Sequence, residues 1–170
     1  MSILNEMNNS TAISVQPITF ADSKWIEEFY TQRWGSGRVV TRATLYTVAE
    51  LPGFIAWKGA TRIGLLTYCL SDEAVEIVTL DSVEPGRGIG TTLISEMIQF
   101  ARVNKHQRLW LITTNDNTPA LRFYQKIGFR LVKIHQDAIR ASRELKHEIP
   151  LTGLDGIPIR DEVEMEYPLS

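Results

Sequence analysis

Three glycines that follow a run of β-branched and apolar residues are the strongest chemical signal in this chain. Gly86, Gly88 and Gly90 are spaced two residues apart, and Arg87 lies between the first two. Glycine lets a backbone approach a ligand closely, and the start of a helix offers free N–H groups and the positive end of its dipole. The spacing therefore predicts a cradle for a phosphate or pyrophosphate. A tight turn between a strand and a helix that binds nothing is the alternative.

A second candidate for chemistry is Glu76, the one ionisable residue within an otherwise apolar run at 75–80. Burial of a carboxyl in an apolar strand raises its pKa, which suits it to accept a proton near neutral pH. The alternative, in which Glu76 faces solvent, fits the sequence equally well. Asp81 is expected on the opposite face of the strand and is the weaker candidate. His135, late on its own strand, is either catalytic or structural.

Two arginines and a tryptophan come together in a Gly-rich segment at 33–38. They are Arg33, Trp34 and Arg38. Loops on a rigid scaffold often determine specificity, and a tryptophan flanked by arginines suits a polar or anionic small molecule. These three residues are therefore candidates for binding a substrate. A surface linker whose Trp34 packs under the fold is an equal alternative.

The elements that must position these residues follow from the hydrophobic periodicity and the turn residues. Three short strands at 54–58, 62–70 and 75–80 are expected to form an antiparallel meander. Apolar residues at helical spacing after Gly88 predict a helix that ends at 104–105. A continuous apolar run at 108–113 then predicts a strand buried on both faces, which completes a βαβ unit.

An amphipathic helix is expected in front of the meander. Its apolar face consists of residues at helical spacing, namely Trp25, Ile26, Phe29 and Tyr30. This helix is expected to end near Gly35, and a short helix or irregular segment is expected at 41–51. A strand at 13–18 is expected to precede the amphipathic helix.

A further helix and two further strands are expected after the βαβ unit. Thr118 is the expected N-cap of a helix at 119–127, which is followed by a strand at 129–134 and a basic helix at 137–146. In the last segment, at 161–167, apolar residues alternate with glutamates, which predicts a half-exposed strand. The order of elements predicts an α+β fold around one mixed sheet.

Composition limits the class of protein. The net charge of −2 gives no electrostatic footprint for nucleic acid. Cys69 is the only cysteine, which excludes an intramolecular disulfide and a thiolate zinc site, and no metal is expected. No apolar run approaches the ~20 residues that span a bilayer, so no membrane partner and a cytoplasmic location are expected. Residues 1–12 are expected to be a disordered N-terminus, and residues 13–170 a single domain.

The segment at 117–129 adds a pattern that is specific when it is combined with the glycines. The pattern is Asn117-x-x-Ala120-x-x-x-Tyr124-x-x-x-Gly128-Phe129, preceded by Gly86-x-Gly88-x-Gly90 at a strand-to-helix turn. Together they resemble the GNAT superfamily of acyl-CoA-dependent N-acetyltransferases, over residues 54–134. The resemblance implies a mixed, largely antiparallel sheet with helices on both faces and a central pair of splayed strands.

The resemblance also implies roles for particular residues. Pro85 stands where the family usually has Arg or Gln, so the binding of coenzyme A pyrophosphate rests on the backbone. The residues of this loop are Arg87, Gly88, Ile89, Gly90, Thr91 and Thr92. The pantetheine arm is expected to pair with the backbone of Val78, Thr79 and Leu80, with Asn117 on its other side. Tyr124 matches the tyrosine near the thioester sulfur, and Glu76 falls where some members carry a general base.

The function implied is transfer of an acetyl group from acetyl-CoA to a primary amine of a small molecule. Tyr124 would act as general acid, since attack by an amine expels a thiolate. A core tyrosine is the alternative for that residue. For the whole chain, the alternative is a non-catalytic acyl-CoA-binding or sensor domain of the same fold. The resemblance leaves the acceptor open and allows a homodimer.

Overall fold

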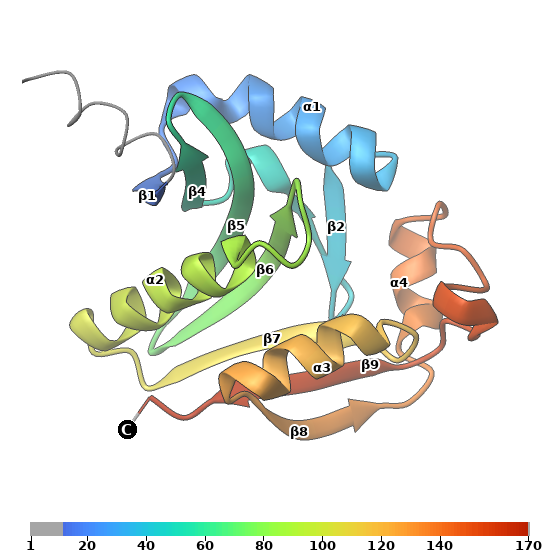
Figure 1. The fold of residues 1–170 in the computed structure, drawn as a ribbon. Coiled ribbons are helices and arrows are strands. Elements are labelled where there is room, and N and C mark those ends of the chain that lie inside the picture. The colour runs from blue at the N-terminus through green and yellow to red at the C-terminus, as the bar shows by residue number, and fades with distance from the viewer. Residues whose placement is uncertain (1–11, 170) are drawn as a thin grey trace, which may run out of the picture.

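The computed structural model describes residues 12–169, and its centre is a seven-stranded sheet with one parallel pair of neighbouring strands (Figure 1). The strand order across the sheet is β1-β4-β5-β6-β7-β9-β8. The strands are β1 (Ile13–Pro17), β4 (Gly53–Lys58), β5 (Thr61–Ser71), β6 (Ala74–Ser82), β7 (Arg108–Thr114), β8 (Arg130–His135) and β9 (Glu162–Tyr167). The expected α+β fold with a mixed, largely antiparallel sheet is confirmed.

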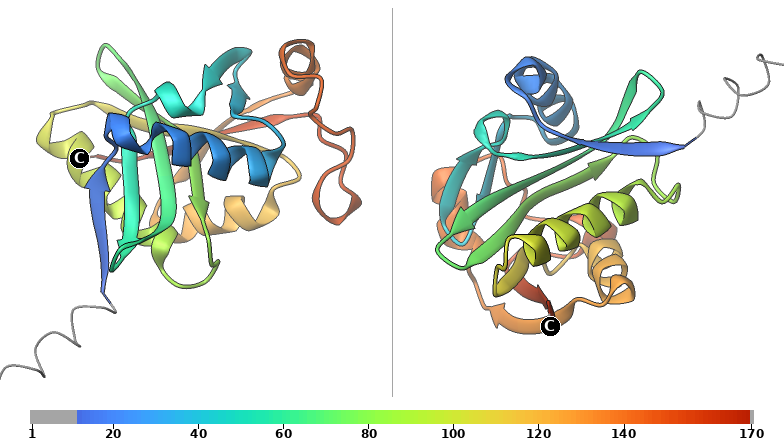
Figure 2. Two further views of the ribbon diagram at one scale, coloured as in Figure 1. Left: turned by 90° about the horizontal axis from the view of Figure 1, so that it is seen from above. Right: turned by 90° about the vertical axis from the view of Figure 1, so that its left-hand side faces the viewer.

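Helices cover both faces of this sheet, as expected, and the right-hand view of Figure 2 shows them on its two sides. On one face lies α1 (Ser23–Trp34), whose Ile26 and Tyr30 pack with Ile55 and Leu65. On the other face α2 (Ile89–Val103) and α3 (Thr118–Ile127) cover the larger apolar core. The remaining helices are α4 (Ile139–Leu145) and the short 3₁₀ helices η1 (Phe20–Asp22), η2 (Val48–Glu50) and η3 (Leu154–Gly156).

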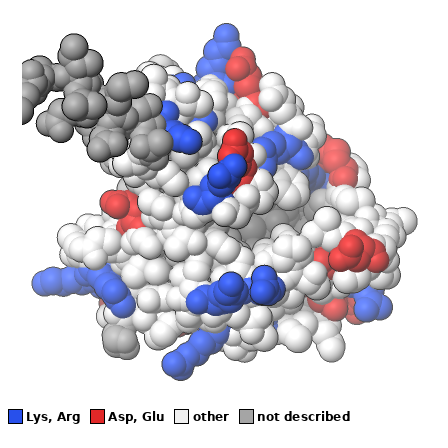
Figure 3. Space-filling model, viewed as in Figure 1, with Lys and Arg blue, Asp and Glu red and all other residues white. Residues whose placement is uncertain are grey.

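The parallel strands β6 and β7 separate part of the way along β6. Their ladder begins with Ala74 opposite Arg108 and ends with Ile77 opposite Leu111. Beyond this point β6 continues to pair with β5, so its backbone from Val78 onward has no partner strand on the β7 side. Figure 3 shows a hollow near the middle of this face of the molecule, over the place where the two strands diverge. The central splayed pair of strands is thus confirmed.

A β-bulge in β6 changes which residues share a face. Thr67 pairs with Thr79 and Tyr68 with Ile77, so Val78 is an extra residue without a partner on β5. One extra residue reverses the alternation of side chains beyond it. Asp81 therefore lies on the same face of the sheet as Glu76, and the expectation that it lies on the opposite face is wrong.

The segment between α1 and β4 is mainly a hairpin, which the short 3₁₀ helix η2 follows. Arg33 and Trp34 belong to the last turn of α1, which Gly35 ends in a left-handed conformation with φ 78°. Strands β2 (Arg38–Thr41) and β3 (Thr44–Thr47) then form a separate two-stranded sheet. The expected helix or irregular segment at 41–51 is wrong over the hairpin, because β-branched valine and threonine residues favour extended backbone there.

Three smaller expectations also require correction. The N-cap of α3 is Asn117, whose side chain accepts from the Ala120 N–H at 3.2 Å, and not Thr118. Strand β7 buries alternate residues only, because one of its faces contributes Leu109 and Leu111 to the core under α2 and α3 while the residues between them stay half-buried on the other face. On β9, Glu162 is 1% exposed and Glu164 is mostly buried, so this strand is less open to solvent than its alternation predicts.

Two expectations concern parts of the chain at or beyond the limits of the described residues. The disordered N-terminus expected at 1–12 lies outside them except for residue 12, and the single domain expected at 13–170 stays a prediction.

Within residues 12–169, no helix combines the length and the apolar character needed to cross a membrane. The cytoplasmic location also stays a prediction.

Candidate functional site

The Gly-rich loop leads from the end of β6 into the first turn of α2. Gly88 is the N-cap of α2, in a left-handed conformation with φ 78°. The N–H and the hydroxyl of Thr92 donate to the Gly88 carbonyl at 3.0 and 2.9 Å, which closes the first helical turn. The N–H groups of Ile89, Gly90 and Thr91 precede that bond and have no acceptor within the helix. They form a ready site for an anion beside the opening between β6 and β7.

The three glycines serve two different physical purposes. Gly86 and Gly88 have φ values of 79° and 78°, and an added Cβ would meet no other atom within 4 Å at either. Their backbone conformation is what requires glycine. At Gly90 an added Cβ would lie 3.1 Å from Cζ of Phe123, so this glycine lets α2 and α3 approach closely.

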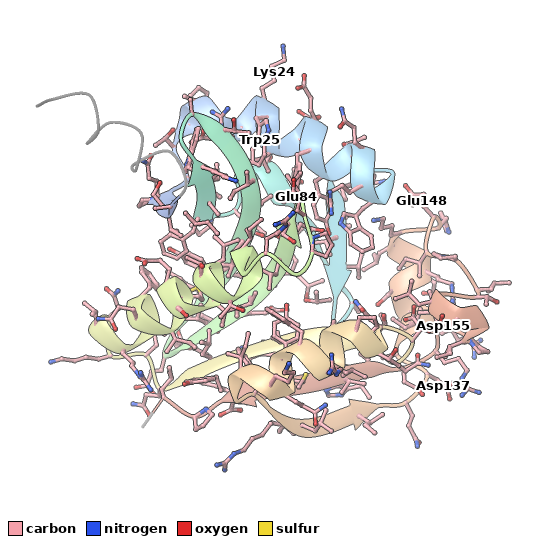
Figure 4. The ribbon with its side chains drawn as sticks, viewed as in Figure 1. Lys24, Trp25, Glu84, Asp137, Glu148 and Asp155 are labelled. Carbon is pink, nitrogen blue, oxygen red and sulfur yellow. The ribbon has the colours of Figure 1, made fainter. Side chains whose placement is uncertain are left out.

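Arg87, between the first two glycines, projects into solvent. Its guanidinium lies 3.3 Å from the carboxylate of Glu84 on the same loop, and both side chains are well exposed. Figure 4 shows Glu84 on this loop between β6 and α2. An exposed ion pair of this kind is weak, so a bound phosphate could compete with Glu84 for Arg87.

Asn117 and Tyr124 approach the opening from α3. The amide oxygen of Asn117 is used as the helix cap, which leaves its NH₂ group available to a ligand. The ring of Tyr124 is buried between Phe123 and Phe129, with centroid distances of 5.2 and 5.3 Å. Burial raises the pKa of its hydroxyl, and the negative charge of Asp81 raises it further. Tyr124 is therefore protonated near neutral pH.

The side of β6 that faces the opening is formed by Val78, Thr79 and Leu80. Val78 is the bulged residue, and the hydroxyl of Thr79 bonds to the hydroxyl of Thr67 at 2.7 Å. Leu80 packs against the apolar core under α2. Because the ladder with β7 ends at Ile77, these residues present backbone groups to the opening.

Glu76 is buried, at 7% exposure, and both of its carboxylate oxygens accept hydrogen bonds from the β2–β3 hairpin. The hydroxyl of Thr41 donates to Oε1 at 2.5 Å, and the hydroxyl of Tyr46 donates to Oε2 at 3.2 Å. Burial raises the pKa of Glu76; the two hydrogen bonds lower it, and the charges of Glu162 and Glu164 raise it again, so that the net direction is upward. A carboxyl with a raised pKa is suited to exchange protons near neutral pH.

Two further glutamates that influence Glu76 lie on β9, the strand beyond β7 in the sheet. Glu162 accepts from the backbone N–H of Arg42 and from the hydroxyl of Ser142, both at 3.2 Å. Glu164 bonds to His135 at 2.7 Å and to Arg108. Although burial raises the pKa of Glu164, these two partners lower it overall.

The sequence alone indicates no role for these glutamates, because alternation with apolar residues is also the pattern of a solvent-facing edge. The only signal for them was the absence of lysine or arginine among the polar positions of that strand.

The three residues expected to bind a substrate are engaged with acidic groups of the protein. Arg33 donates to the Ser82 carbonyl at 2.7 Å and lies 3.5 Å from Asp81, and Trp34 donates to Asp81 at 3.1 Å. Burial raises the pKa of Asp81, although Trp34 and Arg33 act in the opposite direction. Arg38 lies 3.5 Å from Glu148, the residue that Figure 4 labels after α4.

A sheet that opens between two parallel strands, beside a Gly-rich helix N-terminus and a buried tyrosine, is the arrangement that the resemblance to GNAT acetyltransferases implies. The model of the acetyltransferase (GNAT) family matches residues 23–129. The chain belongs to this family.

Individual proteins are also similar to this chain. YxbD of Bacillus subtilis (strain 168), described as an uncharacterized protein, is 40% identical over 139 residues, which are 81% of this chain and 87% of YxbD. Among solved structures, the IAA acetyltransferase from Bacillus cereus ATCC 14579 has a TM-score of 0.69 at 21% identity, and the alignment covers 92% of this chain and 99% of that one. An acetyltransferase from Bacillus subtilis in complex with CoA has a TM-score of 0.66 at 22% identity, covering 94% and 100%. The two structures share the fold of this protein.

Proposed function

We propose that this protein transfers an acetyl group from acetyl-CoA to a primary amine of a small molecule. The observation that carries the proposal is the opening between β6 and β7, where strand backbone without a partner lies beside free helical N–H groups. An extended amide-containing chain that ends in a diphosphate fits both features, and acetyl-CoA is such a molecule. The CoA complex of the structurally similar acetyltransferase supports the same choice.

In this proposal the two ends of the opening hold different parts of acetyl-CoA. The pyrophosphate binds the backbone of the loop, and the pantetheine arm lies between the exposed edge of β6 and the amide of Asn117. The loop residues are Arg87, Gly88, Ile89, Gly90, Thr91 and Thr92, and the strand residues are Val78, Thr79 and Leu80. The thioester then lies near the bulge in β6, between Glu76 and Tyr124.

The chemistry requires that the amine lose a proton before it attacks. Glu76 accepts this proton, and the neutral nitrogen attacks the thioester carbonyl to form a C–N bond. The C–S bond then breaks, the nitrogen loses its second proton to the departing thiolate, and coenzyme A leaves as the thiol. The Tyr124 hydroxyl donates to that sulfur, and its raised pKa makes it a hydrogen-bond donor more readily than a full proton donor.

The acceptor binds, in this proposal, on the side of the sheet that carries Glu76 and the β2–β3 hairpin. Arg33 and Arg38 already pair with carboxylates, whereas Trp34 is 52% exposed and its ring offers an apolar surface. These three residues form part of the acceptor site, and the ring of Trp34 supplies its apolar surface. Glu76, Glu162 and Glu164 favour a cationic amine over an acceptor that carries a carboxylate or phosphate.

Release of coenzyme A in the presence of a panel of primary amines tests the proposal. The panel includes polyamines, amino sugars and amino acids, and calorimetry with acetyl-CoA measures binding separately. Turnover with at least one amine is expected. Tight binding of acetyl-CoA without turnover on any amine would contradict the proposal and favour an acyl-CoA-binding or sensor protein. Sedimentation of the same sample measures its oligomeric state and tests the homodimer that the resemblance allows.

A further inference from the structure

The side-chain hydrogen bonds that join the β2–β3 hairpin to the central sheet end on two carboxylates, those of Glu76 and Glu162. Thr41 and Tyr46 donate to the two oxygens of Glu76 from opposite strands of the hairpin. At the turn, Arg42 donates its backbone N–H to Glu162, and its guanidinium lies 3.7 Å from the second oxygen of Glu162. The hairpin thus reaches Glu76 with side chains from both strands.

The turn of the hairpin has a conformation that its residues do not favour. Arg42 and Ala43 have φ values of 48° and 56°, the left-handed pair required by a two-residue turn of type I′. Such turns usually contain asparagine and glycine, and residues with a Cβ are strained there. Strain of this kind persists only where surrounding contacts determine the conformation. Here the contacts with Glu162 do so, and they fix the position of the adjacent Thr41.

We propose that Thr41 and Tyr46 are positioning residues, which hold the carboxylate of Glu76 in the orientation in which it accepts the proton of the amine. The inference rests on the proposed role of Glu76 as the base. With both oxygens fixed by hydroxyl donors, the carboxylate keeps one orientation and needs no water to satisfy it. Hydroxyl groups suit this task, because they can donate to a carboxylate and rotate to accept when it becomes protonated.

Other ionisable groups near Glu76 also influence its pKa, in addition to these hydrogen bonds. Cys69 on β5 lies beside Tyr46, and Glu162 and Glu164 on β9 add negative charge. Arg42 pairs with Glu162, and His135 on β8 and Arg108 on β7 pair with Glu164. None of these partners donates a hydrogen bond to Glu76, whereas Thr41 and Tyr46 do.

The variants Thr41→Val and Tyr46→Phe remove one donor each and leave the shape nearly unchanged. Because a hydrogen bond to the charged form lowers the pKa of a carboxyl, each variant should raise the pKa of Glu76 by about one unit. The acidic limb of the kcat/KM profile should move to higher pH by the same amount, since a base must be ionised to act. Thr41→Ser, which keeps the hydroxyl, should restore the wild-type profile.

Thr44→Val is the matched control, because Thr44 pairs with Thr41 across the hairpin and its exposed side chain does not reach Glu76. Carbon-13 NMR titration of the Glu76 carboxyl reads the pKa in the protein without acetyl-CoA, and circular dichroism checks the fold. An unchanged pKa in both Thr41→Val and Tyr46→Phe would overturn the inference, as would an equal shift in Thr44→Val. Absence of turnover in the wild-type protein would contradict the proposed acetyl transfer alone, because the titration does not depend on turnover.

Discussion

At the scale of single residues, Tyr124 joins the apolar core to the opening in the sheet. Its ring packs with Phe123 and Phe129, and its hydroxyl has a pKa that burial and the charge of Asp81 raise. The variant Tyr124→Phe keeps the packing and removes only the donor. Turnover should fall about 10- to 100-fold with little change in the affinity for acetyl-CoA, because the hydroxyl is needed only as the thiolate forms.

Steady-state kinetics with calorimetry separates these two quantities for Tyr124→Phe. A loss of acetyl-CoA affinity equal to the loss of turnover would contradict a role in the chemical step and indicate a binding role. Full activity in the variant would leave Tyr124 as a residue of the core.

Gly88 permits a prediction with a control from the same loop. Gly86 and Gly88 have nearly equal positive φ values and equally open surroundings, so an alanine at either meets the same backbone strain. Only Gly88 caps α2, next to the proposed pyrophosphate. Gly88→Ala should weaken acetyl-CoA binding at least about tenfold, which corresponds to ~1.4 kcal/mol, whereas Gly86→Ala should change it much less.

Calorimetric titration of both variants with acetyl-CoA makes this comparison. Equal effects at the two glycines would show that backbone strain in the loop, and not contact with the ligand, accounts for the loss.

At the scale of elements, the hairpin β2–β3 combines a strained turn with contacts to two buried carboxylates. Ala43 is exposed at the turn with φ 56°, so Ala43→Gly removes the strain and costs only the extra entropy of glycine in the unfolded chain. The variant should be more stable by roughly 0.5 kcal/mol. Arg42→Gly should gain less or lose stability, because it also removes the guanidinium beside Glu162.

Urea denaturation of both variants measures this difference in stability. A destabilised Ala43→Gly protein would contradict the assignment of strain to the turn. Equal stabilisation by both substitutions would show that the Arg42 side chain contributes nothing.

The elements also show which parts of the structure could be predicted from the sequence. The meander, α2 and the loop at Gly88 could be predicted, because local periodicity and glycine placement determine them. The bulge at Val78 could not, since a β-branched residue in an apolar run carries no sign of a change in register. The error in placing Asp81 follows from that bulge. The turn at Arg42 and Ala43 lacks the asparagine or glycine that indicates a hairpin. Its conformation is stabilised by Glu162, which is distant in the sequence, so no local pattern predicts it.

At the scale of the whole molecule, the candidate site combines residues that come from distant parts of the chain. Glu76 lies on β6, its hydrogen-bond donors on the hairpin, and the charges that influence it on β9. The identity of Glu76 as a candidate could be predicted, because a lone carboxyl in an apolar strand stands out. Its donors could not, because no local pattern connects Thr41 and Tyr46 with residue 76.

The raised pKa of Glu76 also affects the stability of the whole protein. Burial raises the pKa of the folded state above its unfolded value, so the folded protein binds this proton more tightly. The contribution of Glu76 to stability is therefore complete below the unfolded pKa and is lost as the pH rises through the folded pKa. Glu76→Gln, which resembles the protonated carboxyl, should melt at a higher temperature than the wild type at pH 8 and should lack activity.

The difference in Tm between Glu76→Gln and the wild type should decrease toward zero at about pH 3, where Glu76 is protonated in both states. In a chain of this size, a Tm increase of ~2–4 °C corresponds to each kcal/mol gained. Thermal melts between pH 3 and 8 measure it, with Glu73→Gln, an exposed residue at the β5–β6 turn, as the matched control. A variant that is less stable than the wild type at pH 8 would show that the ionised carboxylate, held by Thr41 and Tyr46, stabilises the fold. In that case the role of Glu76 would be to hold the hairpin on the sheet. Removing its charge would then lower both stability and activity, instead of raising stability at the expense of activity.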